Sequence, residues 1–403
     1  MTAPTVRLYY DDLLLLDFEA TVAAHATWEG RPAAVLDRSA FYPESGGQLA
    51  DAGTLGGVAL ADVQVDDAGV VLHVMDTGAL PPVGATVRGT VDRARRRLHM
   101  ALHTGQHMLS RALLDEARAE TVSSRLGTSA CTLDVDLAAL DDAAVARAES
   151  LVNSVVEDDR PVRAYFPDPA EVPGLPLRRA PKVTRNVRVV DVGGFDLSPC
   201  GGTHCTRTSQ VGVVSVTGTE RYKGRMRVTF LAGRAAVDEL SARSRTIADL
   251  GRAFTCGPRD VPAGIERLRR DLQEARDALG VARGRWAETV ARELLAAMDA
   301  SGDASGEHRA VAVFDLEPVD TLRAVASRVT ARPDAVAFLA SRSPEGTQVL
   351  VARGSASGFD CGAWLKRVAA AHGGRGGGRA DRAEGRLPAE TPWETLARAP
   401  ETV

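Results

Sequence analysis

Two pairs of metal-ligand residues constrain this chain more than any other sequence feature. The first pair is His103 and His107, and the second is Cys200 and His204, far downstream. Residues four positions apart lie one above the other on the same face of an α-helix, so two imidazoles can approach one point. Imidazole nitrogens and a thiolate are usual donors of a tetrahedral Zn²⁺ site. The sequence therefore predicts a fold that brings two distant segments together around one metal ion.

The helix that carries the first pair follows the basic segment 92–97, where the spacing of apolar residues changes. Apolar side chains recur every three or four residues from Leu98 to Leu113, as is typical of a helix with one apolar face. His99 stands four residues before His103, so three histidines share one face of this helix. The spacing leaves open which two of the three bind the metal.

Two other classes of zinc protein are disfavoured by the residues around the ligands. Zinc proteases with an HxxxH motif have a glutamate directly after the first histidine, whereas this chain has Thr104 there. Zinc fingers need ligand pairs close together in a compact domain, and these pairs are too far apart. Cys205, beside His204, is expected to be a bystander. The other three cysteines are expected to be buried small apolar residues: Cys131, Cys256 and Cys361.

Length and composition predict several domains without a membrane span. The chain has 403 residues, more than one hydrophobic core usually holds, so we expect two to four domains. The apolar run Leu13–Leu16 is far too short to cross a membrane, and the N-terminus lacks the apolar stretch of a signal peptide. Five cysteines, one of them wanted as a thiolate, indicate a reducing cytoplasm rather than a disulfide framework.

The N-terminal half reads as two domains. Residues 1–91 contain short strand-like runs separated by Gly, Pro and Asp, which favours a small β-barrel. Within it, the segment Phe41–Gln48 has the form of a tight turn that needs Gly46 and Gly47 at positive φ. Residues 92–234 alternate strands and helices, which predicts an α/β domain with the histidine helix against a sheet.

The C-terminal half reads as a helical arm followed by another α/β domain. Residues 235–300 have heptad-like apolar spacing that includes Leu268, Leu272 and Leu279, interrupted by a break near Pro262, so we expect a helical hairpin arm. The composition of Ser301–Gly306 is typical of a flexible hinge. Residues 306–403 resume strand and helix patterns and end in a Gly/Arg-rich stretch.

Three segments together resemble a known family. The segments are His103-Thr-Gly-Gln-His107, Pro199-Cys-Gly-Gly-Thr-His204 and Phe41-Tyr-Pro-Glu-Ser-Gly-Gly-Gln48. In this order they resemble the free-standing alanyl-tRNA editing proteins of the AlaX family, which are similar to the editing half of alanyl-tRNA synthetase. The arm and the Gly/Arg-rich ending resemble the C-terminal domain that the synthetase shares with DHH phosphoesterases. The resemblance covers nearly the whole chain, which marks the long form of the family.

The resemblance implies an α+β multidomain fold: a small β-barrel, an editing domain like that of threonyl- and alanyl-tRNA synthetases, a helical arm and a DHHA1-like domain. It also implies Zn²⁺ on His103, His107, Cys200 and His204, with His99 as a neighbour. The implied activity is hydrolysis of tRNA(Ala) mischarged with serine, with glycine as a second substrate to consider. The expected partner is therefore mischarged tRNA(Ala), and a homodimer through the C-terminal region is also expected.

Hydrolysis of an aminoacyl ester requires little from a protein, because the ester is already activated. A positioned water and stabilisation of the developing oxyanion suffice. With four protein ligands the zinc sphere is closed, so we favour zinc as organiser of the pocket over direct activation of water. Discrimination against alanine is expected from groups that hydrogen-bond the serine hydroxyl. Gln106, Ser123 and Thr203 are the candidates, with Ser123 preferred to Ser124, which stands where the family has an aromatic residue or glutamine.

RNA binding requires local positive charge, because the net charge of the chain is −4. Basic residues cluster before the histidine helix and in the C-terminal stretch. The predicted RNA contacts are Arg95, Arg96, Arg97, Arg375 and Arg379. The glycine-rich ending does not resemble a P-loop, because no Gly-Lys-Ser/Thr follows it.

Two other functions compete with deacylation. One is a non-catalytic tRNA-binding protein whose zinc is structural, which the unusual Ser124 favours. The other is alanyl-tRNA synthetase itself, which needs a large ATP-binding domain ahead of the barrel, and we expect no such domain in this chain. Release of serine from Ser-tRNA(Ala) separates a deacylase from a binding protein.

Overall fold

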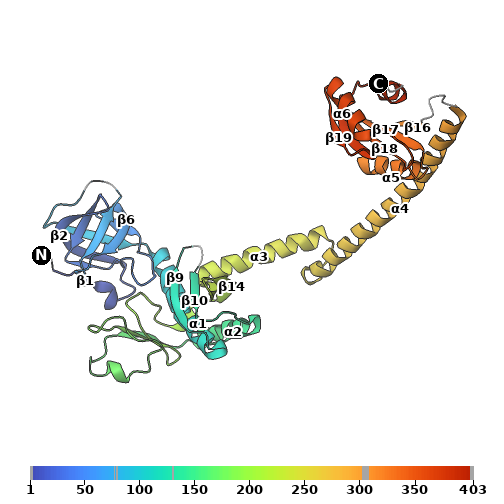
Figure 1. Ribbon diagram of the computed structural model, residues 1–403. Helices are drawn as coiled ribbons and strands as arrows, with labels where there is room; N and C mark the ends of the chain where they lie inside the picture. The colour runs from blue at the N-terminus through green and yellow to red at the C-terminus, as the bar shows by residue number, and fades with distance from the viewer. Residues whose placement is uncertain (1–2, 77, 79, 129–130, 302–307, 400–403) are drawn as a thin grey trace. The chain divides into compact units, whose positions relative to one another are not determined.

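The computed structural model describes residues 3–76, 78, 80–128, 131–301 and 308–399 (Figure 1). These residues form two compact units, residues 1–249 and 250–403. Each unit combines helices with sheets, so the predicted mixed α/β architecture is confirmed. The predicted hinge lies almost wholly outside the described residues. No helix among those described is both long and apolar enough to cross a lipid bilayer.

The first unit begins with a closed antiparallel barrel in the strand order β2-β3-β7-β6-β5-β8. The strands of this region are β1 (Val6–Arg7), β2 (Asp17–Trp28), β3 (Arg31–Leu36), β4 (Arg38–Ser39), β5 (Gly53–Leu55), β6 (Val58–Val65), β7 (Val71–Met75) and β8 (Thr86–Val91). Side chains alternate between the interior and solvent along β2, because successive residues of a strand face opposite sides. Phe18, Ala20 and Val22 consequently enter the barrel core.

The long helix α1 (Arg93–Ala117) follows the barrel directly. Asp92 caps its start by accepting a hydrogen bond from the backbone N–H of Arg95, and Arg118 ends it in the left-handed conformation. Apolar residues of α1 share one core with the alternate residues of the neighbouring sheet, such as Val228 and Phe230. This packing holds the predicted ligand helix rigidly against a sheet.

That sheet is antiparallel and has the strand order β14-β15-β10-β9. Its elements, with the accompanying helix, are β9 (Thr121–Leu126), β10 (Cys131–Val135), α2 (Asp142–Glu157), β14 (Val214–Tyr222) and β15 (Arg225–Ala232). A second small sheet has the order β11-β12-β13 and is formed by β11 (Val162–Tyr165), β12 (Val189–Val192) and β13 (Leu197–Pro199). Gly193 and Gly194 make the turn between β12 and β13 at positive φ, and β13 leads directly into Cys200.

Short 3₁₀ turns complete the first unit, and α3 (Gly233–Ala253) crosses the boundary between the two units. The 3₁₀ turns are η1 (Leu8–Tyr10), η2 (Val172–Gly174) and η3 (Thr208–Val211). Turn η3 ends three residues before β14 begins at Val214.

The second unit packs α4 (Val261–Ser301) and α5 (Val319–Val329) against a five-stranded sheet. The strand order is β16-β17-β18-β20-β19, and only the β16–β17 pair is parallel. Its remaining elements are η4 (Pro258–Asp260), β16 (His308–Asp315), β17 (Ala335–Ser343), β18 (Gly346–Arg353), α6 (Cys361–Ala371), β19 (Arg375–Gly378), β20 (Arg382–Leu387) and α7 (Trp393–Arg398). The first seven residues of β17 are buried, because helices and loops cover this central strand on both faces.

Candidate metal centre and cavity

Helix α1 and the loop after β13 bring the four predicted ligands together. His103 and His107 lie on one face of α1, and Cys200 and His204 lie in the loop that begins where β13 ends. One ligand atom from each of the four residues lies within 4.8 Å of the others. His99 lies one turn earlier on the same helix and is not part of this cluster. The tertiary structure therefore selects two of the three histidines.

Two of the separations between donor atoms match those of a small tetrahedral site. Sγ of Cys200 lies 3.3 Å from Nε2 of His103 and 3.3 Å from Nε2 of His204. Zinc bonds of roughly 2.0–2.3 Å in a tetrahedron separate the donors by about 3.3–3.8 Å. The three imidazoles are buried, with exposed fractions of 4% or less. The four side chains can therefore surround one ion without a change of fold.

Each imidazole of the cluster has its Nδ1 atom against a polar partner, which directs Nε2 toward the common centre. The pairs are His103 with Oε1 of Gln48 at 2.8 Å, His107 with Oδ2 of Asp196 at 3.3 Å, and His204 with Oγ1 of Thr104 at 3.2 Å. Partners of this kind fix the tautomer and the ring orientation of metal-binding histidines. The same arrangement on all three histidines is the pattern expected of metal ligands.

The charges of the cluster also fit a cation. Burial alone would raise the pKa of the Cys200 thiol, but neighbouring His103 and His204 lower that pKa well below its ordinary value. Burial, with His103 nearby, lowers the pKa of His204 to about 3, so this imidazole is neutral. Nε2 of His107 is buried and has no hydrogen-bond partner among the described residues. A thiolate, the neutral imidazole of His204 and an unpartnered buried imidazole nitrogen on His107 are donors that suit Zn²⁺.

Two glycines allow segments distant in sequence to approach this centre. A Cβ atom on Gly202 would collide with the imidazole ring of His103 and approach Oε1 of Gln48 at 3.0 Å. A Cβ atom on Gly47 would lie 2.6 Å from the carbonyl oxygen of Ser124, and Gly47 also has φ +87°. The tight turn expected in the segment Phe41–Gln48 therefore serves to press that segment against β9.

Gln48 links the barrel to the metal centre, a role that the sequence analysis missed. Its Oε1 atom accepts a hydrogen bond from the backbone N–H of Thr203 at 3.1 Å, in addition to its contact with His103. Its Nε2 atom donates to Oγ1 of Thr203 at 2.9 Å. The only signal in the sequence was its place at the end of the glycine segment, because no local pattern shows which distant side chain a glutamine meets.

Arg188 is a second residue whose role the sequence analysis missed. It is 4% exposed, and its Nη1 atom donates to the carbonyl oxygens of Cys200 at 3.0 Å and Gly202 at 2.8 Å. Its backbone oxygen also accepts from the N–H of Cys200 at 2.9 Å. Arg188 therefore holds the ligand loop from two sides.

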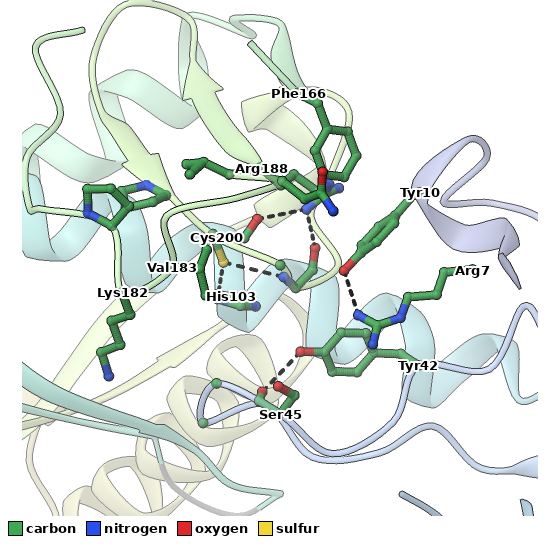
Figure 2. Close-up of a pocket in the computed structure, with 18 of the residues that line it drawn as sticks. Arg7, Tyr10, Tyr42, Ser45, His103, Phe166, Lys182, Val183, Arg188 and Cys200 are labelled. Carbon is green, nitrogen blue, oxygen red and sulfur yellow. Dashed lines mark hydrogen bonds between the residues drawn. The ribbon is translucent and has the colours of Figure 1, made fainter. Parts of the chain in front are cut away.

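A cavity of about 1040 Å³ adjoins the metal centre (Figure 2). His103 and Cys200 line it, together with Tyr10 and Tyr42 from the barrel region. Its charged lining residues are Arg7, Arg179, Lys182, Arg185 and Arg188. None of the described residues that line it carries a carboxylate. The cavity is thus strongly cationic in a chain of net negative charge.

The three predicted substrate contacts occupy different environments. Ser123 and Ser124 both line the cavity. The Oγ atom of Ser123 donates a hydrogen bond to Oδ2 of Asp134 at 2.7 Å. Gln106 is buried on α1 and donates to Oγ of Ser110 at 2.8 Å. Thr203 is buried against Gln48. Gln106 and Thr203 are not among the residues that line the cavity, so only Ser123 faces the space that a substrate would enter.

The predicted RNA contacts are distributed over both units, and one of them is corrected. Arg97 is exposed, and Arg95 is half-buried with Nε donating to the carbonyl oxygen of Ala50. Arg96 is fully buried, and its guanidinium pairs with Asp51 at 2.5 Å, so no phosphate can reach it. In the second unit Arg375 and Arg379 are exposed, and Arg379 lines a cavity of about 660 Å³ beside β19.

The other four cysteines lie outside the cluster. Cys131, Cys205 and Cys361 are buried, as expected of small apolar residues, whereas Cys256 is only half-buried. Burial raises the pKa of the Cys205 thiol to about 11. Cys205 therefore stays a neutral thiol, although it adjoins His204.

Comparison with known proteins finds two domain families in this chain. The threonyl and alanyl tRNA synthetase second additional domain matches residues 187–229, which include Cys200 and His204. The DHHA1 domain matches residues 308–403, which lie in the second unit. The two matches thus cover the ligand loop and most of the C-terminal unit.

Relatives of known function are similar over most of the chain. The alanine–tRNA ligase of Halorubrum lacusprofundi is 36% identical over 75% of this chain and 33% of its own length. That of Thermococcus kodakarensis is 32% identical over 95% of this chain and 42% of its own length. The chain thus spans about two fifths or less of these relatives. The C-Ala domain of Aquifex aeolicus alanyl-tRNA synthetase is 24% identical over 22% of this chain and 82% of that structure, with a TM-score of 0.21.

The two domain matches lie largely within the part of the chain that is similar to alanine–tRNA ligases. The second additional domain precedes the DHHA1 domain, and similarity to alanine–tRNA ligases extends across both. The three sequence segments that suggested the AlaX family lie together around the metal centre. These matches support the resemblance of this chain to the AlaX-like alanyl-tRNA editing proteins, because it contains segments similar to the editing and C-terminal domains of alanyl-tRNA synthetase.

Proposed function

We propose that this protein is a zinc-dependent aminoacyl-tRNA deacylase that hydrolyses Ser-tRNA(Ala) in trans, with Gly-tRNA(Ala) as a second candidate substrate. The observation that carries the proposal is the position of the His/Cys cluster at the wall of a cationic cavity. A cavity with five cationic side chains and no carboxylate favours a ligand rich in phosphate. A metal centre beside it favours chemistry on the end of that ligand.

The residues of the centre would hold zinc and shape the reaction site. When bound, zinc supplies positive charge that can anchor a polar group of the substrate. His103 and Cys200 are the two ligands that also line the cavity, so the ester would approach from their side. Arg188 donates hydrogen bonds to the loop carbonyl oxygens of Cys200 and Gly202, and its positive charge offsets their repulsion of a developing oxyanion. In this proposal, groups that line the cavity position the attacking water.

Ser123 is the best candidate for recognition of the serine side chain. Its hydroxyl hydrogen is donated to Asp134, and Arg227 holds that carboxylate at 2.7 Å. The oxygen of Ser123 therefore keeps its lone pairs available and can accept a hydrogen bond from the substrate hydroxyl. Alanine would leave this acceptor without a partner, which disfavours Ala-tRNA(Ala). Direct contacts of Gln106 and Thr203 with the substrate stay predictions.

Exposed arginines support tRNA as a partner, and exposed leucines on α4 support the assembly of a homodimer. Arg95, Arg97, Arg375 and Arg379 are proposed to contact the tRNA backbone. Leu268, Leu272 and Leu279 on α4 are each about half exposed, which supports a homodimer through the second unit. Light scattering after gel filtration would show twice the monomer mass.

Because a zinc thiolate persists under reducing conditions, the cytoplasm is the proposed compartment.

The proposal is tested by incubating the purified protein with Ser-tRNA(Ala), Gly-tRNA(Ala) and Ala-tRNA(Ala). We expect rapid release of serine and much slower release of alanine. The Cys200→Ala variant serves as the inactive control, and Cys205→Ala as the matched active control. Zinc-dependent tRNA binding without release of any amino acid would instead identify a non-catalytic tRNA-binding protein.

A further inference from the structure

We infer that Phe166 and Tyr10 form a stacking platform for the terminal base of a single-stranded RNA 3′ end, and that Arg179, Lys182 and Arg185 bind the phosphates behind that base. This inference rests on the proposed function and specifies how its substrate is held. It assigns a recognition role to three segments outside the metal centre: the 3₁₀ turn η1, the residue directly after β11, and the segment between η2 and β12.

Phe166 is a half-exposed aromatic side chain in the wall of a cavity that five cationic side chains also line. It lines the cavity, yet 50% of it is accessible to solvent. Its ring packs edge to face on Tyr10, with 5.6 Å between the ring centroids. Figure 2 shows these two rings beside Arg188, on the same side of the cavity. A large exposed aromatic ring inside a cavity indicates a planar or apolar ligand.

Tyr10 is held in place on three sides, so the platform is preformed. Nη1 of Arg7 donates to its hydroxyl oxygen at 2.9 Å. The guanidinium carbon of Arg188 lies 4.9 Å from the centroid of its ring, and Phe166 covers another side. Because the rings need not be ordered when the ligand binds, stacking would cost little conformational entropy.

The cationic part of the cavity comes from an irregular segment that lacks internal charge pairs. Arg179, Lys182 and Arg185 all line the cavity, and none of them forms an ion pair with a carboxylate among the described residues. Arg178, directly before them, is tied by Nε to Oδ1 of Asp196 at 2.6 Å, which anchors the start of the segment. Three adjacent cations without local partners favour a polyanion as ligand.

Aromatic faces combined with free cations recognise single-stranded nucleic acid. Bases splayed from a single strand stack on aromatic rings, while lysine and arginine follow the phosphates. A base on Phe166 and a backbone along the segment 179–185 would leave the terminal ribose and its ester in the cavity with His103 and Cys200. A free amino acid carries a single carboxylate and no base, so it would not use the aromatic platform together with three cations.

The platform is tested by the binding of two labelled RNA oligonucleotides to the full-length zinc-loaded protein. One ends in CCA, and the other has the same length but lacks the terminal base. We expect the wild type to bind the CCA oligonucleotide about 5- to 100-fold more tightly, as stacking of one base predicts. Phe166→Ala should abolish this preference, and Phe166→Trp should retain it. Tyr165→Ala, the neighbouring exposed aromatic that does not line the cavity, should leave it unchanged.

The cations are tested by the salt dependence of the same binding. Lys182→Gln and Arg185→Gln should weaken binding of both oligonucleotides equally and reduce the salt slope by about 0.7 for each phosphate that is no longer neutralised. Arg163→Gln, an exposed residue of β11 that does not line the cavity, is the matched control and should bind as the wild type does. An unchanged slope in both cavity variants would overturn the assignment of the phosphate site.

Hydrolysis assays distinguish failure of the platform from failure of the proposed function. With Ser-tRNA(Ala), Phe166→Ala should raise KM and leave kcat within about twofold, because the base is bound equally before and during the reaction. A wild type that prefers the CCA oligonucleotide but releases no serine would uphold the platform and refute the deacylase. A wild type without that preference, or a Phe166→Ala variant that retains it, would overturn the platform whatever the activity.

Discussion

Oε1 of Gln48 lies 2.8 Å from Nδ1 of His103, and this contact joins the N-terminal barrel region to the metal centre. Both side chains are buried, with exposed fractions of 0% and 4%. Because an amide oxygen can only accept, the contact places the imidazole proton on Nδ1 and leaves the lone pair of Nε2 for the cluster. The barrel region therefore takes part in building the site.

Replacing Gln48 by alanine should lower zinc affinity about 10- to 100-fold, because His103 loses the partner that fixes its tautomer. Gln48→Glu should lose less zinc affinity than Gln48→Ala, since a carboxylate still accepts a hydrogen bond from Nδ1 of His103. Competition with a chromophoric chelator measures the affinity. Gln64→Ala, which removes a glutamine bonded to Asp62 away from the centre, should bind zinc as the wild type does. Equal affinity in the two alanine variants would contradict the role of Gln48.

Replacing Cys200 by alanine should remove zinc and deacylation together, because three imidazoles retain metal less firmly than the complete donor set. Elemental analysis of the purified protein should fall from one zinc per chain to almost none. Cys205→Ala should retain the metal, since that sulfur lies outside the cluster. A Cys200→Ala protein with one zinc per chain would refute the ligand assignment.

Replacing Arg188 by methionine should loosen the ligand loop, because two carbonyl oxygens lose a charged donor. We expect a loss of about 1.5–3 kcal/mol in the free energy of unfolding, together with faster zinc release. Arg188→Lys should lose less of the free energy of unfolding than Arg188→Met but should not match the wild type, since an ammonium group cannot reproduce the planar set of donors of a guanidinium. Urea unfolding and chelator kinetics measure both effects. Arg163→Met is the matched control. If the two methionine variants had the same free energy of unfolding and the same rate of zinc release, Arg188 would not stabilise the ligand loop.

Acid should destabilise the barrel through His73. Burial lowers the pKa of this histidine to about 4, and its Nδ1 atom donates to the carbonyl oxygen of Ala34 at 3.0 Å. The unfolded chain takes up the proton near pH 6.5, so stability is complete above that pH and falls as the pH approaches 4. The loss attributable to this group is about 3 kcal/mol.

Denaturant unfolding between pH 4 and 7.5 checks this expectation by the difference between wild type and His73→Gln. The variant should show a shallower decline, because glutamine does not titrate. His25→Gln removes a histidine whose Nε2 atom contacts the carbonyl oxygen of Pro81 at an exposed site, and it should follow the wild type. Parallel curves for wild type and His73→Gln would show that His73 titrates normally.

Replacing Arg375 and Arg379 by serine should weaken tRNA binding several-fold for each residue and reduce its salt slope by about one for each phosphate that is no longer bound. The turnover of bound Ser-tRNA(Ala) should stay unchanged, because neither residue belongs to the metal cluster or lines the cavity beside it. Filter binding at several salt concentrations measures the slope. Arg398→Ser supplies a control on the same unit. Unchanged affinity would remove the second unit's arginines from the tRNA interface.

Local sequence was sufficient to predict the elements that carry the site. The apolar spacing around His103 and His107 predicted a helix, and α1 carries both residues. The two glycines before Gln48 predicted a turn at positive φ, and both adopt it. Such features depend on the preferences of a few consecutive residues, so they can be recognised without knowledge of the rest of the fold.

The arginines at the start of α1 show that local sequence patterns do not predict which side chains are buried. Arg96 and Arg97 are neighbours of identical chemistry, yet one is buried against Asp51 and the other is exposed. The choice depends on which face of the helix meets the barrel and on where the barrel places a carboxylate. Sequence spacing alone therefore counted both as RNA contacts.

The sequence by itself determined which residues could bind a metal, because imidazoles four apart on a helix and a Cys/His pair limit the chemistry available. The tertiary structure decided that His99 is left out, that Gln48 orients His103, and that Arg188 and Phe166 meet at one cavity. The physical reason is that these contacts join segments far apart in the chain. Their formation depends on the packing of whole elements, which no short stretch of sequence encodes.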